Sequence, residues 1–140
     1  MPAHVIDSIF FKDLFGTPAM RQVFDDHTLL QKWLDYEAAL ARAQAKLGMF
    51  PVAVADEITT QAQAALMDTD AIKHGIDKTV HPLVSLIWQL SHRCGGDAGR
   101  YVHWGATTQD GMDTAIILQI RDAIPVFEAT LDALERAMIR

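Results

Sequence analysis

Hydrophobic positions recur at helical spacing along most of this chain. Apolar residues three and four positions apart would line one face of an amphipathic helix. No stretch alternates cleanly between apolar and polar residues, which is the pattern of a half-buried strand. The pattern therefore predicts an all-α protein.

The first half of the chain predicts two helices. Pro18 is expected to begin a brief helical turn, because its fixed φ is tolerated at a helix start. Asp25 or Asp26 then caps a long helix that ends before Gly48 and Pro51. The apolar positions of this long helix are Leu30, Trp33, Leu34, Leu40, Ala41 and Leu47.

The middle of the chain predicts two more helices with a looser stretch between them. A helix rich in Ala and Gln is expected over residues 52 to about 67. Residues 68–79 are polar, and we expect Gly75 to break helical structure there. Residues 81–94 are apolar on most sides, which indicates a helix that is buried or lies at a subunit interface. A flexible loop is expected at the glycines that follow, Gly95, Gly96 and Gly99.

The last helical pattern begins near two aspartates and runs to the end of the sequence. Asp110 and Asp113 suit the cap and first turn of this helix. Pro125 is expected to kink or divide it, because proline removes a backbone donor and clashes with the preceding turn. Arg140 falls inside the periodic pattern and no Gly, Asn or Pro follows it. We therefore expect the helix to be truncated.

Composition narrows the class of protein. The chain has 140 residues, half of them hydrophobic, which suits one domain with a sizeable core. A formal net charge of −6 argues against a nucleic-acid surface, which needs clustered Lys and Arg. No segment approaches the ~20 apolar residues of a membrane span, and the start does not read as a signal peptide. The single Cys94 cannot form an internal disulfide and lies in an apolar run, so we expect a core residue and a cytoplasmic location.

Residues 101–114 (YVHWGATTQDGMDT) carry the most informative chemistry. Thr107 and Thr108 offer hydroxyl donors directly before an apolar helix, whose N-terminus attracts anions. His103 adds a group that binds or moves a proton near neutral pH. This combination indicates a site for a small molecule bearing a carboxylate. A second interpretation stays open, because Thr107 and Asp110 also fit a capping box that only supports the helix start.

Two stretches resemble a known superfamily. HWGATTQDGMDTA, within residues 103–115, is similar to the first signature region of the fumarase/aspartase superfamily and most similar to its 3-carboxy-cis,cis-muconate cycloisomerase branch. Residues 14–51 resemble the opening of the same enzymes. The resemblance implies that residues 1–109 form the N-terminal helical domain of that fold. Residues 110–140 would form the first part of a long helix of its central bundle.

The resemblance also implies an activity. It predicts a cofactor-free enzyme that adds or eliminates a proton beside a carboxylate, most like the cycloisomerase of aromatic-compound breakdown. It further implies a homotetramer whose active sites combine several subunits, and a general-base serine downstream of residue 140. The 140-residue chain alone is therefore expected to be inactive. An adenylosuccinate lyase-type C–N lyase that releases fumarate is the alternative, and a non-catalytic helical oligomerisation module is an alternative of another class.

By resemblance, four consecutive residues bind substrate and two histidines are catalytic. The substrate-binding positions are Thr107, Thr108, Gln109 and Asp110, and the catalytic positions are His81 and His103. We expect the Asp110 carboxylate to turn toward helix amides, because it would repel an anion. A surface role for His81 and a backbone-bonded loop role for His103 are the alternatives that the residue types leave open.

Other residues indicate which substrate is expected and whether a metal is bound. Leu14 and Phe15 stand where adenylosuccinate lyases usually carry an Arg-Tyr pair that meets phosphate, which argues against a nucleotide substrate. His81, by contrast, matches the adenylosuccinate branch. The remaining histidines lack ligand-like spacing and Cys94 has no sulfur partner, so no metal site is predicted. Glu37 falls on the apolar stripe of its helix, where a buried ion pair is expected.

Overall fold

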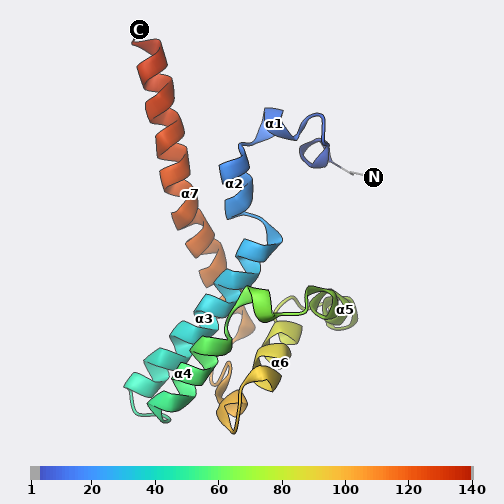
Figure 1. The fold of residues 1–140 in the computed structure, drawn as a ribbon, viewed down its shortest axis with the longest axis vertical. Coiled ribbons are helices and arrows are strands. Elements are labelled where there is room, and N and C mark those ends of the chain that lie inside the picture. The colour runs from blue at the N-terminus through green and yellow to red at the C-terminus, as the bar shows by residue number, and fades with distance from the viewer. Residues whose placement is uncertain (1–3, 140) are drawn as a thin grey trace.

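The computed structural model describes residues 4–139 and is helical throughout, with no strand in that part of the chain. The long helices α3 and α7 cross near the middle of the molecule, α4 runs alongside the later part of α3, and α5 packs on α6 at the level where α3 begins (Figure 1). The helices have the bounds α1 Lys12–Phe15, α2 Pro18–Val23, α3 Asp26–Lys46, α4 Val52–Gln61, α5 Thr69–Thr79, α6 Val84–Arg93 and α7 Thr108–Met138. Short 3-10 turns cover η1 Val5–Asp7, η2 Ala64–Leu66 and η3 Ala98–Tyr101. The all-α prediction is confirmed.

Helix α3 begins and ends where its sequence predicts. The Asp25 side chain accepts a hydrogen bond from the Thr28 N–H at 2.7 Å, which satisfies an amide that has no partner within the helix. Gly48 follows the last turn with φ of +75°, a conformation that glycine adopts without strain. One face of the helix forms the centre of the core through Leu30, Leu34, Ala38, Ala41 and Ala45.

Helix α4 is shorter than predicted, because it ends at Gln61 rather than near residue 67. The Gln31 side chain of α3 donates to the Ala62 carbonyl at 3.1 Å and accepts from the Ala64 N–H at 2.8 Å. These two bonds satisfy backbone groups that a longer helix would have paired internally. A tertiary contact thus ends α4 and allows the short turn η2.

The expectation that Gly75 breaks the chain is wrong, since α5 runs through it without interruption. Asp68 caps this helix by accepting a hydrogen bond from the Ala71 N–H at 2.9 Å. Gly75 lies against Ser85, where a Cβ would come within 2.7 Å of the Ser85 Cβ. The glycine is therefore needed for close packing of α5 on α6.

Helix α6 begins at Val84 and has one buried face, formed by Leu86 and Leu90. Of the two predicted alternatives, full burial within this chain does not hold, because the Trp88 side chain on the same helix is 56% exposed. Its location at a subunit interface stays a prediction.

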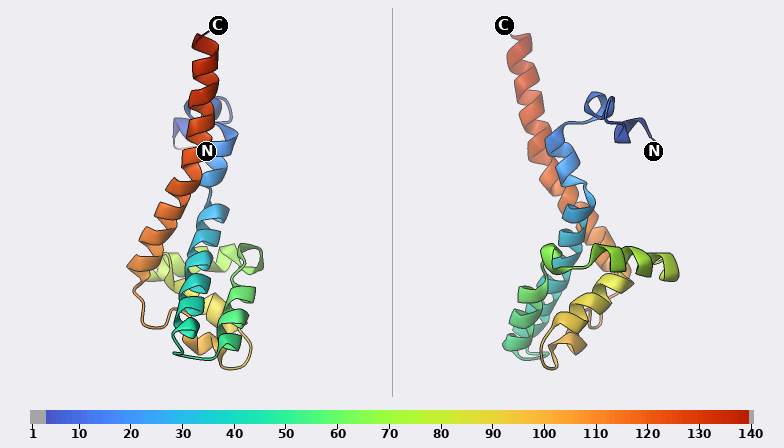
Figure 2. Two further views of the ribbon diagram at one scale, coloured as in Figure 1. Left: turned by 90° about the vertical axis from the view of Figure 1, so that its left-hand side faces the viewer. Right: turned by 45° about the vertical axis from the view of Figure 1, so that its right-hand side comes forward.

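Helix α7 begins at Thr108, two residues before the predicted start, and continues through Pro125. Because the helix is unbroken across Pro125, the proline does not divide it. The left view of Figure 2 shows the lower part of α7 inclined to its upper part. Lys32 pairs with Asp122 at 2.6 Å, which joins α3 to α7. The upper half of α7 extends beyond α3–α6, and α2 lies beside it (Figures 1 and 2). Arg140, on which the expected truncation partly depended, lies outside the described residues.

No helix of the described part combines the length and apolarity needed to cross a bilayer.

Candidate functional site

The predicted site residues come from two separate segments that meet at the first turn of α7. His81 lies in the turn between α5 and α6, and Thr108 is the first residue of α7. The His81 Nε2 and the Thr108 Oγ1 are 3.0 Å apart, which is a hydrogen bond. The structure therefore joins two of the predicted site residues directly.

The second ring nitrogen of His81 determines the direction of that bond. Its Nδ1 accepts a hydrogen bond from the Leu83 N–H at 3.2 Å. In the neutral ring the proton must then lie on Nε2, which donates to the Thr108 oxygen. The hydroxyl proton of Thr108 is thereby left to donate to another group. This pair presents a polarised hydroxyl donor beside the N-terminus of α7, where partial positive charge also favours an anion.

Val80 holds His81 in this place with an unusual backbone conformation. Its φ of +54° lies in the left-handed region, which a β-branched residue rarely adopts. The residue ends α5 and its N–H donates to the Ile76 carbonyl at 2.8 Å. The sharp turn that follows directs the His81 ring to α7.

His103 contacts a different helix. Its Nδ1 is 2.6 Å from the Glu37 Oε1 on α3, and the Glu37 side chain is 1% exposed. Glu37 therefore has a buried hydrogen-bond partner, His103, and the ion pair expected for it forms only when that ring is protonated. His103 has φ of +59°, so the backbone itself is turned to bring the ring inward.

Aromatic side chains fix the segment that carries His103. Phe50, in the loop before α4, packs against Tyr101 and Trp104 with ring centroids 4.8 and 6.2 Å away. Gln44 of α3 donates to the Trp104 carbonyl at 2.6 Å. The loop backbone is thus held in place on both sides of His103.

Thr107 and Asp110 form the capping box that the sequence allowed. The Thr107 N–H donates to the Asp110 Oδ2 at 3.3 Å, so this carboxylate turns toward the helix amides as expected. Gln109 is exposed, and its amide donates to the Asp113 Oδ1 at 2.7 Å. Both arrangements support the helix start, and neither tests the predicted contact of Thr107, Gln109 and Asp110 with substrate.

The His81–Thr108 pair and the His103–Glu37 pair lie in the same region of the molecule, where α7 packs closely on its neighbours at Gly111. A Cβ on Gly111 would lie 2.9 Å from the Leu83 Cδ2 and 3.2 Å from the Tyr36 Cδ1. The Tyr36 ring is in turn 6.5 Å from the His103 ring, centroid to centroid. Burial raises the pKa of Tyr36, and the negative charges of Glu37 and Asp110 raise it further. Tyr36 is a site neighbour that sequence analysis missed, because it stands beside, not on, the apolar stripe of α3.

The other chemically active residues lie apart from this neighbourhood. Burial raises the pKa of the Cys94 thiol to about 11, which agrees with the core position predicted for it. Within residues 4–139, no group of three or more His, Cys, Asp or Glu side chains is arranged to hold a metal ion.

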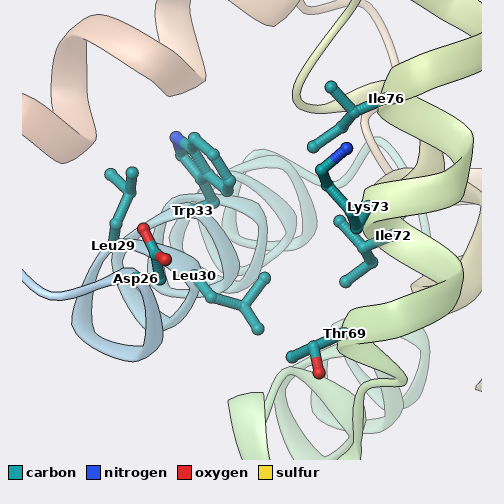
Figure 3. A pocket seen from close by; sticks show the side chains of 8 residues that line it. All are labelled: Asp26, Leu29, Leu30, Trp33, Thr69, Ile72, Lys73 and Ile76. Atoms are coloured by element: carbon teal, nitrogen blue, oxygen red, sulfur yellow. The ribbon is translucent and has the colours of Figure 1, made fainter. Parts of the chain in front are cut away.

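A mostly apolar hollow of about 270 Å³ lies between α3 and α5, and no predicted site residue lines it (Figure 3). The charged residues at its edge are Asp26 and Lys73, and Lys73 already pairs with Asp77. Its other lining residues are Leu29, Leu30, Trp33, Thr69, Ile72 and Ile76. The hollow therefore offers no free cation to an acidic ligand.

Comparison with known proteins gives consistent matches. A family model described as "Lyase" matches residues 15–140. The chain is 39% identical to the adenylosuccinate lyase of Methanocaldococcus jannaschii, covering 89% of this chain and 27% of the relative. It is 41% identical to the 3-carboxy-cis,cis-muconate cycloisomerase of Pseudomonas putida, covering 89% of this chain and 30% of the relative.

A solved structure gives the same result. The 3-carboxy-cis,cis-muconate lactonizing enzyme of Pseudomonas putida superposes with a TM-score of 0.82 at 41% identity. The match covers 87% of this chain and 28% of that enzyme. The chain thus spans less than a third of the length of the relatives it matches.

Proposed function

The chain belongs to the lyase family of the fumarase/aspartase superfamily, and from this we propose that it supplies part of the active site of an enzyme that adds or removes a proton beside a substrate carboxylate. The substrate is an unsaturated di- or tricarboxylate, and the reaction needs no cofactor. The observation that carries the proposal is the 3.0 Å hydrogen bond between His81 and Thr108 at the start of α7.

This reaction requires stabilisation of negative charge. A carbon beside a carboxylate loses a proton only if the charge spreads into that carboxylate and preorganised donors receive it. The Thr108 hydroxyl, polarised by the His81 N–H, is such a donor, and the first amides of α7 are others. A hydrogen bond to a charged group contributes about 1.5–3 kcal/mol, so these donors supply a substantial part of the stabilisation.

We propose distinct roles for the other predicted residues. His103 meets the substrate with its Nε2, and Thr107 and Gln109 contribute donors at the edge of the carboxylate site. Asp110 orients the threonine loop through its bond to the Thr107 N–H.

A 3-carboxy-cis,cis-muconate substrate is the proposal for this chain. The amino-acid sequence of residues 103–115 supports this proposal, as does the similarity to the Pseudomonas putida enzyme. Leu14 and Phe15 are 74% and 64% exposed, and neither side chain can pair with a phosphate. Cleavage of adenylosuccinate is the second candidate, because His81 contacts Thr108 and the adenylosuccinate lyase relatives are of similar identity.

The assembly and the location are parts of the same proposal. We propose that residues 110–140 are the first part of a helix of a central bundle, that residues 1–109 are the N-terminal helical domain, and that several copies combine to complete each site. A cytoplasmic location is proposed as well, which the single free cysteine supports.

Assays of a protein extended through the downstream family regions test the proposal. Loss of the muconate absorbance with 3-carboxy-cis,cis-muconate, and no cleavage of adenylosuccinate, is the expected result. Fumarate release from adenylosuccinate would instead establish the C–N lyase. Inactivity on both acids, with the fold retained, would favour the non-catalytic oligomerisation module.

The 140-residue chain serves as the control for that assay. By resemblance the general-base serine lies beyond residue 140, so this chain alone should turn over neither acid. Turnover by the purified chain, with host enzyme excluded, would contradict the proposed placement of the catalytic groups.

A further inference from the structure

Glu37 is a carboxylate in an unfavourable position unless it has a specific partner. Its side chain is 1% exposed and lies among the apolar residues of the α3 core face. Burial of an unpaired carboxylate is costly, so a residue of this kind is retained where it pairs with a charge or a hydrogen-bond donor. Its Oε1 meets the His103 Nδ1 at 2.6 Å, and that is the pairing the structure provides.

This contact determines which nitrogen of His103 carries the proton. An ionised carboxylate only accepts hydrogen bonds, so the Nδ1 must donate. In the neutral ring the Nε2 then carries a lone pair and no proton. The Nε2 is buried and has no partner within the described part of the chain. A buried nitrogen left in that state costs free energy unless another group binds it.

We propose that Glu37 is a positioning residue that holds the His103 ring so that Nε2 is the atom that exchanges a proton or hydrogen bond with the substrate. A proton gained at Nε2 gives an imidazolium whose charge faces the Glu37 carboxylate, and its loss restores the neutral ring. The Nδ1–H remains on Glu37 in both states. The substrate part of this inference rests on the proposed function, whereas the tautomer does not.

A neighbouring residue provides a matched control. Gln44 is also on α3, is buried, and bonds to the carbonyl of Trp104, the residue next to His103. Both Glu37 and Gln44 thus tie the same loop to the same helix, but only Glu37 touches the imidazole ring. A purely structural role for Glu37 predicts the same effects from Glu37→Leu and Gln44→Leu.

The first test is the tautomer of His103, read from long-range ¹H–¹⁵N correlation spectra of the chain at a pH where the ring is neutral. The wild-type ring should carry its proton on Nδ1, with His103→Asn used to assign the signals. Glu37→Leu should shift the proton toward Nε2, while Glu37→Gln, whose amide oxygen still accepts, and Gln44→Leu should not. A wild-type ring protonated on Nε2 would overturn the inference without any variant having to fold.

The second test is kinetic and uses the extended, active protein. Glu37→Leu should lower kcat/KM by roughly ten- to a hundredfold, the range found when the partner that orients a metal-bound histidine is removed. Gln44→Leu should lower Tm while kcat/KM stays within about twofold of wild type. Equal losses of kcat/KM in Glu37→Leu and Gln44→Leu would mean that Glu37 only holds the loop on α3. An Nδ1-protonated His103 in a protein that acts on none of the carboxylates would refute the proposed function and leave the ring-holding role intact.

Discussion

At the scale of single residues, the two adjacent threonines have different surroundings although the sequence presents them as a pair. Thr107 belongs to the capping box with Asp110, whereas Thr108 bonds to His81 from another segment. A capping residue contributes to stability, and a donor aimed at a substrate contributes to catalysis. Variants of Thr108 separate these two contributions.

Replacement of Thr108 by Ala removes the proposed carboxylate donor and little volume. In the extended protein we expect kcat/KM to fall roughly ten- to a hundredfold, which matches the loss of one hydrogen bond to a charged group, while Tm changes little. Steady-state kinetics and thermal unfolding measure the two effects.

Two further variants make this result specific. Thr108→Ser keeps a hydroxyl and should retain most activity. Thr114→Ala changes an exposed threonine of the same helix and should leave kinetics unchanged. Wild-type kinetics in Thr108→Ala, together with a stability loss of about 1 kcal/mol, would mean that Thr108 only supports the helix start.

At the scale of elements, the packing of α5 on α6 depends on an absent side chain. Gly75 lies in the interior of α5, where Ala would ordinarily stabilise a helix by about 0.5–1 kcal/mol. Here a Cβ would overlap the Ser85 side chain, which is 5% exposed and has little room to move. The higher helix propensity of Ala would raise the free energy of unfolding, and the overlap with Ser85 would lower it. The sign of the measured change shows which effect is larger.

We expect Gly75→Ala to lower the free energy of unfolding by about 1–3 kcal/mol, the usual cost of overpacking a close contact. Chemical denaturation of the variant measures this change. Ser85→Gly removes the opposing side chain, so the double variant should recover part of the loss in a double-mutant cycle. A stabilised Gly75→Ala variant would contradict the close contact between α5 and Ser85.

At the scale of the whole molecule, α7 leaves a long apolar surface uncovered. Its large apolar side chains are about half exposed or more: Ile116, Ile117, Ile120, Ile124, Phe127, Leu131, Leu134 and Met138. Apolar surface of this extent on a helix usually marks an interaction site. This surface agrees with the proposed assembly of several copies.

We therefore expect the chain to self-associate in solution, as measured by light scattering. Phe127→Glu combined with Leu134→Glu should shift the distribution toward monomer, because charged residues oppose burial of that face. Ala137→Glu adds a charge on an exposed position of the same helix without removing a large apolar side chain, and should have less effect. A compact wild-type monomer would count against the assembly.

The sequence by itself determined the features that depend on neighbouring residues. The all-α class, the cap of α3 at Asp25 and its end before Gly48 follow from periodicity and local hydrogen bonding. The segment of residues 101–114 identified the family and the start of the candidate site for the same reason, because its threonines, histidine and helix start are close together in the chain. Local chemistry was sufficient for these predictions.

Only the tertiary structure decided the features that depend on distant residues. Gln31 ends α4 from another helix, and Ser85 explains why Gly75 is tolerated inside α5. The partners of the two histidines of the candidate site, Thr108 for His81 and Glu37 for His103, are 27 and 66 positions away in the chain. Periodicity shows which residues face inward, but the packing of one helix on another determines which of those residues meet.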